Sequence, residues 1–284
     1  MQKYMVLYNP LSNNKKGEES AREAEKVFEN GEFSYKSVLE IKSYAEYFKE
    51  LSDEYTVVLA GGDGTLNKFV NNLNNEKLSR DVYYFPAGSG NDFMHDVSED
   101  GKLKYIKLNP YVENLPTVEI NGKKSLFING IGFGIDGYCC EVGDELRKTT
   151  DKPINYAGIA IKGLLFHFKP VTATINTDGV ERVFKNAWLA PTMNGRFYGG
   201  GMNATPTQDR LNKELSLTTM VFYGKSRIGT LMKFPGIFKG EHIKHKNAVT
   251  LIKGYRIKVT FDRPCALQID GETVLNVTSY EVYH

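Results

Sequence analysis

The chain has 284 residues and a formal net charge of +2 at pH 7, and 41% of its residues are hydrophobic, so it is long enough for two domains with separate cores. The nearly balanced charge gives no general attraction to nucleic acid, and no basic run is interleaved with aromatic residues. The three cysteines, Cys139, Cys140 and Cys265, have neither metal-ligand nor disulfide-framework spacing. We therefore expect a protein of the reducing cytoplasm that binds no nucleic acid.

The hydrophobic segments are too short for membrane insertion. Residues 3–8 are predicted as a short strand and lack the apolar core of a signal peptide. The longest nearly apolar stretch, residues 156–168, includes Lys162 and His167 and is too short to span a bilayer. The sequence predicts neither secretion nor a transmembrane segment.

Strand and helix signals alternate from the N-terminus to about residue 115. We expect strands at 3–8, 33–39, 56–60 and 82–85, and helices at 17–28, 44–51 and 65–73. This alternation is typical of βαβ units, and it predicts an α/β nucleotide-binding domain with a doubly wound parallel sheet over residues 1–116.

Three loops follow strands of this predicted sheet: residues 9–13, 61–65 and 86–92. All three are rich in Gly, Asn and Ser, and two of them contain a carboxylate. Ligands of doubly wound sheets bind outside the carboxyl ends of the strands. The three loops together therefore indicate a binding site at that edge.

The loop Gly61-Gly62-Asp63-Gly64-Thr65 carries the most specific signal. It lies between a buried strand and a helix, so its glycines let a ligand approach the backbone, and the helix N-terminus favours a phosphate. Asp63 would repel a bare phosphate, which argues for a bound cation beside it. The alternative is a tight turn with a solvated Asp.

The chain changes character at residue 117. Short alternating segments are separated by turn signals such as Asn121-Gly122, Asp178-Gly179 and Asp270-Gly271. They predict a mainly antiparallel β-sandwich over residues 117–273, interrupted by one helical stretch at 156–168. We expect this stretch to pack on the core, and the alternative is a contact with the membrane. The tail, residues 274–284, is predicted as a strand that pairs either with this domain or back onto the first.

Phosphoryl transfer needs a base for the acceptor hydroxyl, and Asp270 and Glu272 are the candidates. Both lie at the end of an apolar strand, in Gln268-Ile269-Asp270-Gly271-Glu272. Transfer further requires backbone amides for the donor phosphates and carboxylates for a cation, which the first domain supplies. The alternative is a type I′ hairpin turn without chemistry.

The whole chain resembles the diacylglycerol kinase catalytic-domain family of lipid kinases, in its bacterial soluble branch. Seven motifs occur in the family's order: Tyr8-Asn9-Pro10-x-Ser12, Gly61-Gly62-Asp63-Gly64-Thr65-Leu66-Asn67, Pro86-x-Gly88-Ser89-x-Asn91-Asp92-Phe93, Phe127-x-Asn129-x-x-Gly132-x-Gly134, Asn194-Gly195-x-x-Tyr198-Gly199-Gly200-Gly201, Gly240-x-His242 and Asp270-Gly271-Glu272.

The resemblance implies an ATP-dependent lipid kinase that transfers the γ-phosphoryl group to a diacylglycerol-like hydroxyl in a cleft between the domains. It implies Mg²⁺ at Asp63 and Asp92, with Glu119 as a further acid, and it makes Asp270 the base with Glu272 nearby. The residues implied for ATP are Asn9, Pro10, Ser12, Gly61, Gly62, Asp63, Gly64, Thr65, Asn67, Gly88, Ser89 and Asn91.

Two positions depart from the family pattern. Asn212-Lys213 stands where members often have Asp-Gly and a second, structural Mg²⁺, and an amide beside a cation is poor support for that ion. Ser89 stands where many bacterial members have Thr, and it keeps the hydroxyl. Two other functions stay open: a soluble NAD-kinase-like enzyme and a non-catalytic nucleotide-binding regulator.

A lipid substrate requires approach to a membrane. Residues 223–246 contain six Lys or Arg, a single acid, Glu241, and interleaved apolar residues. We expect this stretch either to dock on the inner face of the cell membrane or to be a packed, solvated element. The sequence does not identify the lipid, and a homodimer is one possible oligomeric state.

Overall fold

A computed structural model describes residues 1–284 except 29, 74–75, 89, 99–100 and 151–153. The chain divides into two compact units, Met1–Leu115 and Pro116–His284. The first carries the loops at residues 9–13, 61–65 and 86–92, and the second carries the Asp270-Gly271 turn.

The first unit is built on one five-stranded sheet. Its strands are β1 (Gln2–Tyr8), β2 (Gly31–Ser37), β3 (Tyr55–Gly61), β4 (Val82–Pro86) and β5 (Ile106–Lys107), in the order β2-β1-β3-β4-β5. The first four strands pair in parallel, and the short β5 runs antiparallel to β4. The carboxyl ends of β1, β3 and β4 therefore lie side by side.

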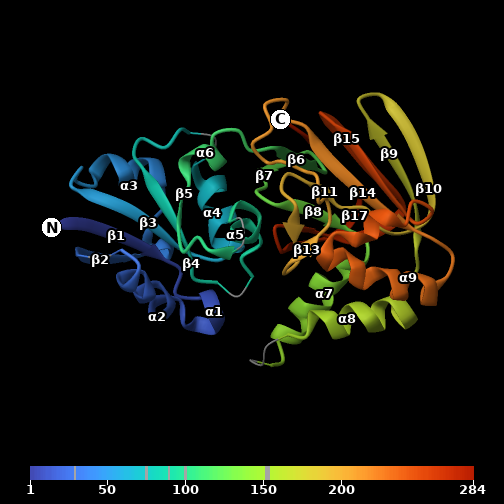
Figure 1. The fold of residues 1–284 in the computed structure, drawn as a ribbon, viewed down its shortest axis with the longest axis horizontal. Coiled ribbons are helices and arrows are strands. Elements are labelled where there is room, and N and C mark those ends of the chain that lie inside the picture. The colour runs from blue at the N-terminus through green and yellow to red at the C-terminus, as the bar shows by residue number, and fades with distance from the viewer. Residues whose placement is uncertain (29, 74–75, 89, 99–100, 151–153) are drawn as a thin grey trace. The chain divides into compact units, whose positions relative to one another are not determined.

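Helices cover both faces of this sheet (Figure 1). They are α1 (Ser12–Lys15), α2 (Gly17–Arg22), η1 (Glu23–Lys26), η2 (Val38–Glu40), α3 (Tyr44–Glu50), α4 (Asp63–Leu73), α5 (Asp92–Val97) and α6 (Asn109–Val112). On one face Ala21 and Ala24 pack with Val6 and Val58, and on the other α3 packs on α4 through Tyr44 and Phe69. The predicted doubly wound α/β class is confirmed.

The second unit contains one large antiparallel sheet. Its strands are β6 (Thr117–Ile120), β7 (Lys123–Leu126), β8 (Gly130–Phe133), β9 (Val171–Thr177), β10 (Val180–Leu189), β11 (Thr192–Met193), β14 (Leu217–Tyr223), β15 (Val249–Gly254), β16 (Arg256–Ile269) and β17 (Glu272–Tyr283). A separate pair is formed by β12 (Phe197–Tyr198) and β13 (Met202–Asn203).

This sheet closes on itself instead of forming two separate layers. The order β16-β8-β11-β14-β10-β9 returns to β16, because the first half of β16 pairs with β9 and its last residues pair with β8. The domain is thus a barrel-like form of the predicted antiparallel β domain. The C-terminal strand β17 pairs with β16 and β6, so the alternative that it pairs with the first domain is wrong.

Helical segments pack against the barrel of the second unit. They are α7 (Ile135–Arg147), α8 (Tyr156–Lys162), η4 (Gly163–His167), α9 (Arg227–Lys233), η5 (Phe234–Lys239) and η6 (Glu241–Lys244). In Figure 1, α7 and α8 lie together below the strands. None of the helices in the described part of the chain has the length and apolarity needed to cross a bilayer.

Candidate active site

Two glycine-rich loops of the first unit touch through their backbones. A Cβ on Gly88 would overlap the Cα of Gly62, and a Cβ on Gly61 would lie 2.5 Å from the Cβ of Thr65. The carbonyl of Gly61 accepts hydrogen bonds from the Tyr84 hydroxyl and the Ala87 amide, both at 2.9 Å. Glycine is required here because larger residues would separate the loops after β3 and β4.

The loop after β1 joins them through polar side chains. The Asn9 amide donates to the Thr65 hydroxyl at 3.2 Å, and the Ser12 and Thr65 hydroxyls are 3.3 Å apart. Pro10 lies in this turn, where the Ser12 amide donates to the Asn9 carbonyl. The structure therefore brings Asn9, Ser12 and Thr65 together beside the N-terminus of α4, where the positive end of the helix dipole favours an anion.

Asp63 has a structural partner that the sequence did not reveal. Its carboxylate accepts the backbone amides of Asp92 and Phe93 at 2.8 and 2.9 Å, which caps the N-terminus of α5. The negative charge of Asp63 also stabilises α5, because it lies at the positive end of the helix dipole. Asp63 therefore ties the loop after β3 to the segment after β4, and a metal-linked role is no longer needed to explain its presence.

The remaining predicted residues of this unit lie close by or within α4. Asn91 donates to the Gly88 carbonyl at 2.9 Å, and its Oδ1 is buried without a hydrogen-bond partner among the described atoms. Asp92 is buried, and the Asn67 side chain accepts from Asn71 inside α4. Gly64 lies in the first turn of α4, and Ser89 is outside the described residues.

Glu119 belongs to the second unit, on β6. Its carboxylate lies 3.7 Å from the Lys124 Nζ and 3.5 Å from the Tyr283 hydroxyl. These contacts explain Glu119 as a charged residue of a strand that pairs with β7 on one side and β17 on the other. Its predicted metal role stays a prediction.

Asp270 is held by three backbone amides. Its carboxylate accepts from Ile128, Asn129 and Gly130 at 2.6, 2.8 and 3.0 Å. Asp270 and Gly271 both have positive φ, as the two-residue type I′ turn between β16 and β17 requires. The hairpin is therefore present, and it also fixes a buried carboxylate that three backbone amides hold in place.

Two further side chains, those of Asn194 and Arg210, contact the backbone segment at residues 128–130 that holds Asp270. The Asn194 side chain donates to the Ile128 carbonyl at 3.0 Å, and the Arg210 guanidinium donates to the Asn129 side chain at 3.0 Å. Arg210 places a positive charge beside the segment that holds Asp270. Sequence reasoning missed Arg210, although it occurs in the segment that departs from the family pattern.

The glycine and histidine motifs of the second unit have structural roles. Gly199, Gly200 and Gly201 all have positive φ in the turn between β12 and β13. His242 is buried, its Nε2 lies 2.9 Å from the Ala204 carbonyl, and burial lowers the pKa of its imidazole. Glu272, the second predicted catalytic acid, is an exposed residue at the start of β17.

Asp136 is a buried carboxylate that the sequence did not single out. The Tyr198 hydroxyl donates to it at 3.0 Å, and the Gly137 amide donates at 2.9 Å. Burial is the main cause that raises the pKa of Asp136 from 3.8 to about 6. Asp136 thereby anchors the strand that leads into the triple-glycine turn.

We predict a stability change with pH from Asp136. Between about pH 3.8 and 6 the folded protein keeps this proton while the unfolded chain loses it, so the free energy of unfolding falls as pH rises, by up to roughly 3 kcal/mol. Urea unfolding at several pH values measures the slope. Asp136→Asn should remove this contribution, and an unchanged slope in that variant would refute it.

Asn212, which stands where the resembled family often has Asp, has a structural role in this chain. The Asn212 amide donates to the carbonyls of Asp209 and Ser216 at 2.6 and 3.1 Å, and its Oδ1 accepts the Ser216 amide and hydroxyl at 2.9 and 2.8 Å. These four bonds cross-link residues 209–216 directly. The loop therefore has an internal connection at the place where the family resemblance suggested a structural ion.

We predict that this loop needs no divalent ion. Asn212→Ala should lower the free energy of unfolding by about 1–3 kcal/mol, because Ser216 loses its acceptor. The exposed neighbour Lys213→Ala should have little effect. Chelation by EDTA, without nucleotide, should leave the melting temperature of the wild type unchanged, and a marked fall would argue for a bound ion.

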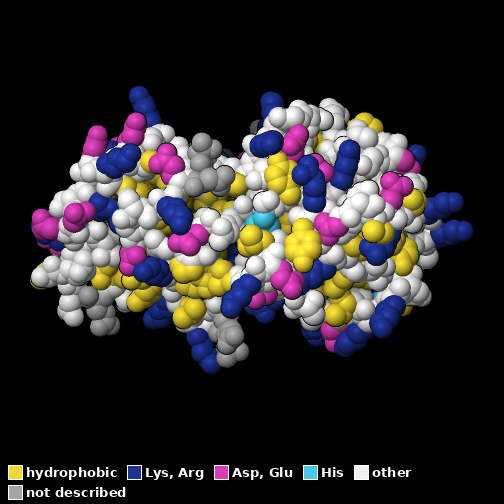
Figure 2. Space-filling model, turned by 90° about the horizontal axis from the view of Figure 1, so that it is seen from above, with side chains coloured by type: hydrophobic (Ala, Val, Ile, Leu, Met, Phe, Trp, Pro, Cys, Tyr) yellow, Lys and Arg dark blue, Asp and Glu magenta, His cyan; other side chains and the backbone are white. Residues whose placement is uncertain are grey.

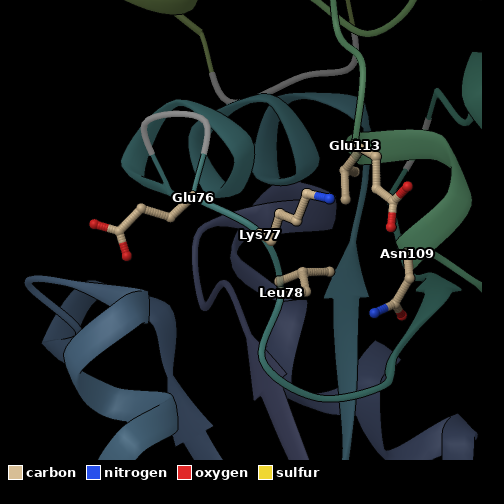
Figure 3. Close-up of a pocket in the computed structure, with 6 residues that line it drawn as sticks. Glu76, Lys77, Leu78, Asn109 and Glu113 are labelled. Carbon is tan, nitrogen blue, oxygen red and sulfur yellow. The ribbon is translucent and has the colours of Figure 1, made fainter.

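A small pocket of the first unit is not a candidate site. Figure 3 shows Glu76, Lys77, Leu78, Asn109 and Glu113 around a cavity of about 10 Å³, room for about one water molecule. It lies beyond the C-terminal end of α4, whereas the glycine-rich loop forms the other end. The Asn109 side chain is already bonded to the backbone of Arg80 and Val82.

Comparison with known families assigns both units. Residues 3–111 match the family model described as "Diacylglycerol kinase catalytic domain". Residues 129–281 match the model described as "YegS C-terminal NAD kinase beta sandwich-like domain". The two matches together span most of the chain.

Individual proteins are similar over large parts of the sequence. The chain is 25% identical to "Putative lipid kinase YtlR" of Bacillus subtilis (strain 168), covering 99% of this chain and 96% of that protein. It is 26% identical to "Diacylglycerol kinase" of Mycobacterium tuberculosis (strain ATCC 25618 / H37Rv), covering 66% and 61%. A crystal structure titled as a putative diacylglycerol kinase from Bacillus anthracis str. Sterne shares the fold, with a TM-score of 0.65 at 16% identity and coverage of 99% and 93%.

Proposed function

Because this chain belongs to the diacylglycerol kinase catalytic-domain family, we propose that it transfers the γ-phosphoryl group of ATP to the hydroxyl of a lipid alcohol. The observation that carries the nucleotide part is the joining of three loops at the ends of β1, β3 and β4. A diacylglycerol-like acceptor is supported by the names of the relatives.

The loops of the first unit suit the donor phosphates. Gly62 and Gly88 present bare backbone, and Asn9, Ser12 and Thr65 supply an amide and two hydroxyls beside the N-terminus of α4. Backbone amides and a helix N-terminus stabilise phosphate without counter-charge on side chains. These groups would bind and orient the nucleotide for transfer.

The same site fits Mg²⁺ of the kind that arrives with a nucleotide. No three His, Cys, Asp or Glu side chains form a metal-binding group in the part of the chain that the structure describes. Mg²⁺ in kinases is usually held by one or two carboxylates together with phosphates and waters. Asp63 and Asp92 would supply the carboxylates, and the buried Oδ1 of Asn91 is a further oxygen. The ion would neutralise phosphate charge.

Asp270 is the proposed base for the acceptor. Three amides fix its carboxylate in place, so it would meet the acceptor hydroxyl without reorganising, and Arg210 would offset negative charge nearby. Asp270 would take the hydroxyl proton as the oxygen attacks the γ-phosphorus, and ADP would leave.

A screen of acceptors tests this proposal. The purified full-length protein, with ATP and Mg²⁺, is assayed for ADP release against diacylglycerol, phosphatidylglycerol and sphingoid bases in mixed micelles, and against NAD in solution. We expect ADP release that depends on a lipid alcohol. ADP release with NAD alone would support the NAD-kinase-like alternative, and nucleotide binding without turnover on any acceptor would support a regulatory protein.

A further inference from the structure

Two helical segments of the second unit expose large apolar side chains. Met232 is 79% exposed, Phe166 73% and Ile228 67%. Ile228 and Met232 are four residues apart on α9 and so share one face. The outward face of a surface helix is normally polar. We use the term docking surface for the exposed residues Ile161, Phe166, Ile228, Met232 and Phe238.

The two segments are fixed to each other and to the core. The Arg227 guanidinium at the start of α9 donates to the Leu164 carbonyl in η4 at 2.7 Å, and it lies 5.4 Å from the centre of the Trp188 ring. Leu164 and Ile237 are fully buried beneath them. The predicted core packing of residues 156–168 is therefore seen on one face, through Leu164, whereas Ile161 and Phe166 are exposed.

The two chain segments that carry the docking surface are strongly basic. Residues 154–170 and 223–246 contain eight Lys or Arg and one acid, Glu241, whose carboxylate is bonded to Lys244 at 2.9 Å. The basic residues are Lys162, Lys169, Lys225, Arg227, Lys233, Lys239, Lys244 and Lys246. On the face in Figure 2, by contrast, basic and acidic side chains are interspersed.

We infer that an anionic phospholipid bilayer covers the docking surface, with the apolar side chains inserted and the lysines over the headgroups. Apolar residues surrounded by bases are typical of interfacial membrane binding. A second copy of this chain is disfavoured because two such positive surfaces repel each other. Lys225 and Lys233 also line a cavity of about 110 Å³.

This inference adds a partner to the proposed function, and it is tested by binding instead of catalysis. The full-length protein is sedimented with vesicles of two compositions. One is phosphatidylcholine alone, and the other is phosphatidylcholine with roughly 30% phosphatidylglycerol. We expect binding only to the anionic vesicles, weakening as salt rises. Each lysine strengthens such binding roughly five-fold, so Lys233→Glu with Lys239→Glu should weaken it about 25-fold or more. Phe166→Ser with Met232→Gln should weaken it by at least about ten-fold.

Matched changes in the first unit are the control. Leu39 is exposed and apolar and Lys49 is exposed and basic, so Leu39→Gln with Lys49→Glu should leave vesicle binding unchanged. Equal binding by the docking-surface variants and the wild type would overturn the inference. A dimer that forms without lipid and that these variants abolish would also overturn the inference. A folded wild type that binds neither kind of vesicle would overturn it too, and would assign the docking surface to a protein partner. ADP release with a short-chain, water-soluble alcohol reports the proposed function separately.

Discussion

Replacing Asp270 by Asn is expected to lower kcat by on the order of 10² or more while ATP binding is retained. The amide cannot accept the hydroxyl proton. ATP binding should be retained because Asp270 belongs to the second unit, whereas the loops proposed to bind ATP belong to the first. Steady-state kinetics with the best lipid acceptor give kcat, and fluorescent-nucleotide titration gives the ATP affinity. Turnover near the wild-type rate would remove Asp270 from the catalytic role.

The structure requires a control for this variant, because the Asp270 carboxylate also accepts three backbone amides. Asp178 provides a matched one. It begins an Asp-Gly turn with positive φ at both residues, and its carboxylate accepts the amides of Tyr255 and Arg256, but it is exposed. Asp178→Asn should lower stability without lowering kcat. If both variants lost activity in proportion to stability, the effect of Asp270→Asn would be structural.

Asp63→Ala is expected to have the second large effect, a loss of roughly 10²-fold or more in turnover together with a loss of stability. The variant removes a carboxylate proposed for Mg²⁺ and the cap of α5, and losing a cap costs about 0.5–2 kcal/mol. We therefore expect the variant to be less stable as well as less active. The measurement is kcat at several Mg²⁺ concentrations, together with thermal unfolding.

Ser43→Ala separates the two roles of Asp63. Ser43 caps α3 of the same unit through the Glu46 amide at 3.2 Å, and it does not belong to the glycine-rich loops. Its loss should destabilise the first unit while turnover is kept. If Asp63→Ala remained fully active at low Mg²⁺, the metal assignment would fail and the cap alone would explain this residue.

The family and the fold class were predictable from sequence because motifs and buried strands are local signals. The helix α7 was missed, since Gly137 and Gly143 resemble helix breakers. In the structure a Cβ on Gly137 would overlap the Ala266 carbonyl, and one on Gly143 would lie 2.7 Å from the Tyr156 ring. These glycines allow close packing, and that reason is visible only once the chain has folded.

Long-range pairing explains the other differences. Short segments were expected in this part of the chain, but β16 runs through Pro264 with a shift of register against β17 between Thr260 and Cys265. That irregularity lets one strand pair with both β9 and β8 and close the barrel. The caps made by Asp63 and the position of Arg210 likewise join residues far apart in sequence.

The most direct test of the central proposal follows the phosphoryl group itself. The wild type, Asp270→Asn and Asp178→Asn are incubated with ATP labelled at the γ-phosphate and with each of the lipid alcohols named above, diacylglycerol first, in mixed micelles. The organic phase is then counted. We predict label in the lipid with the wild type and Asp178→Asn, and on the order of 10²-fold less with Asp270→Asn. Label that stays in the aqueous phase for the whole panel of lipid alcohols, with the folded wild type and bound ATP, would contradict a lipid kinase.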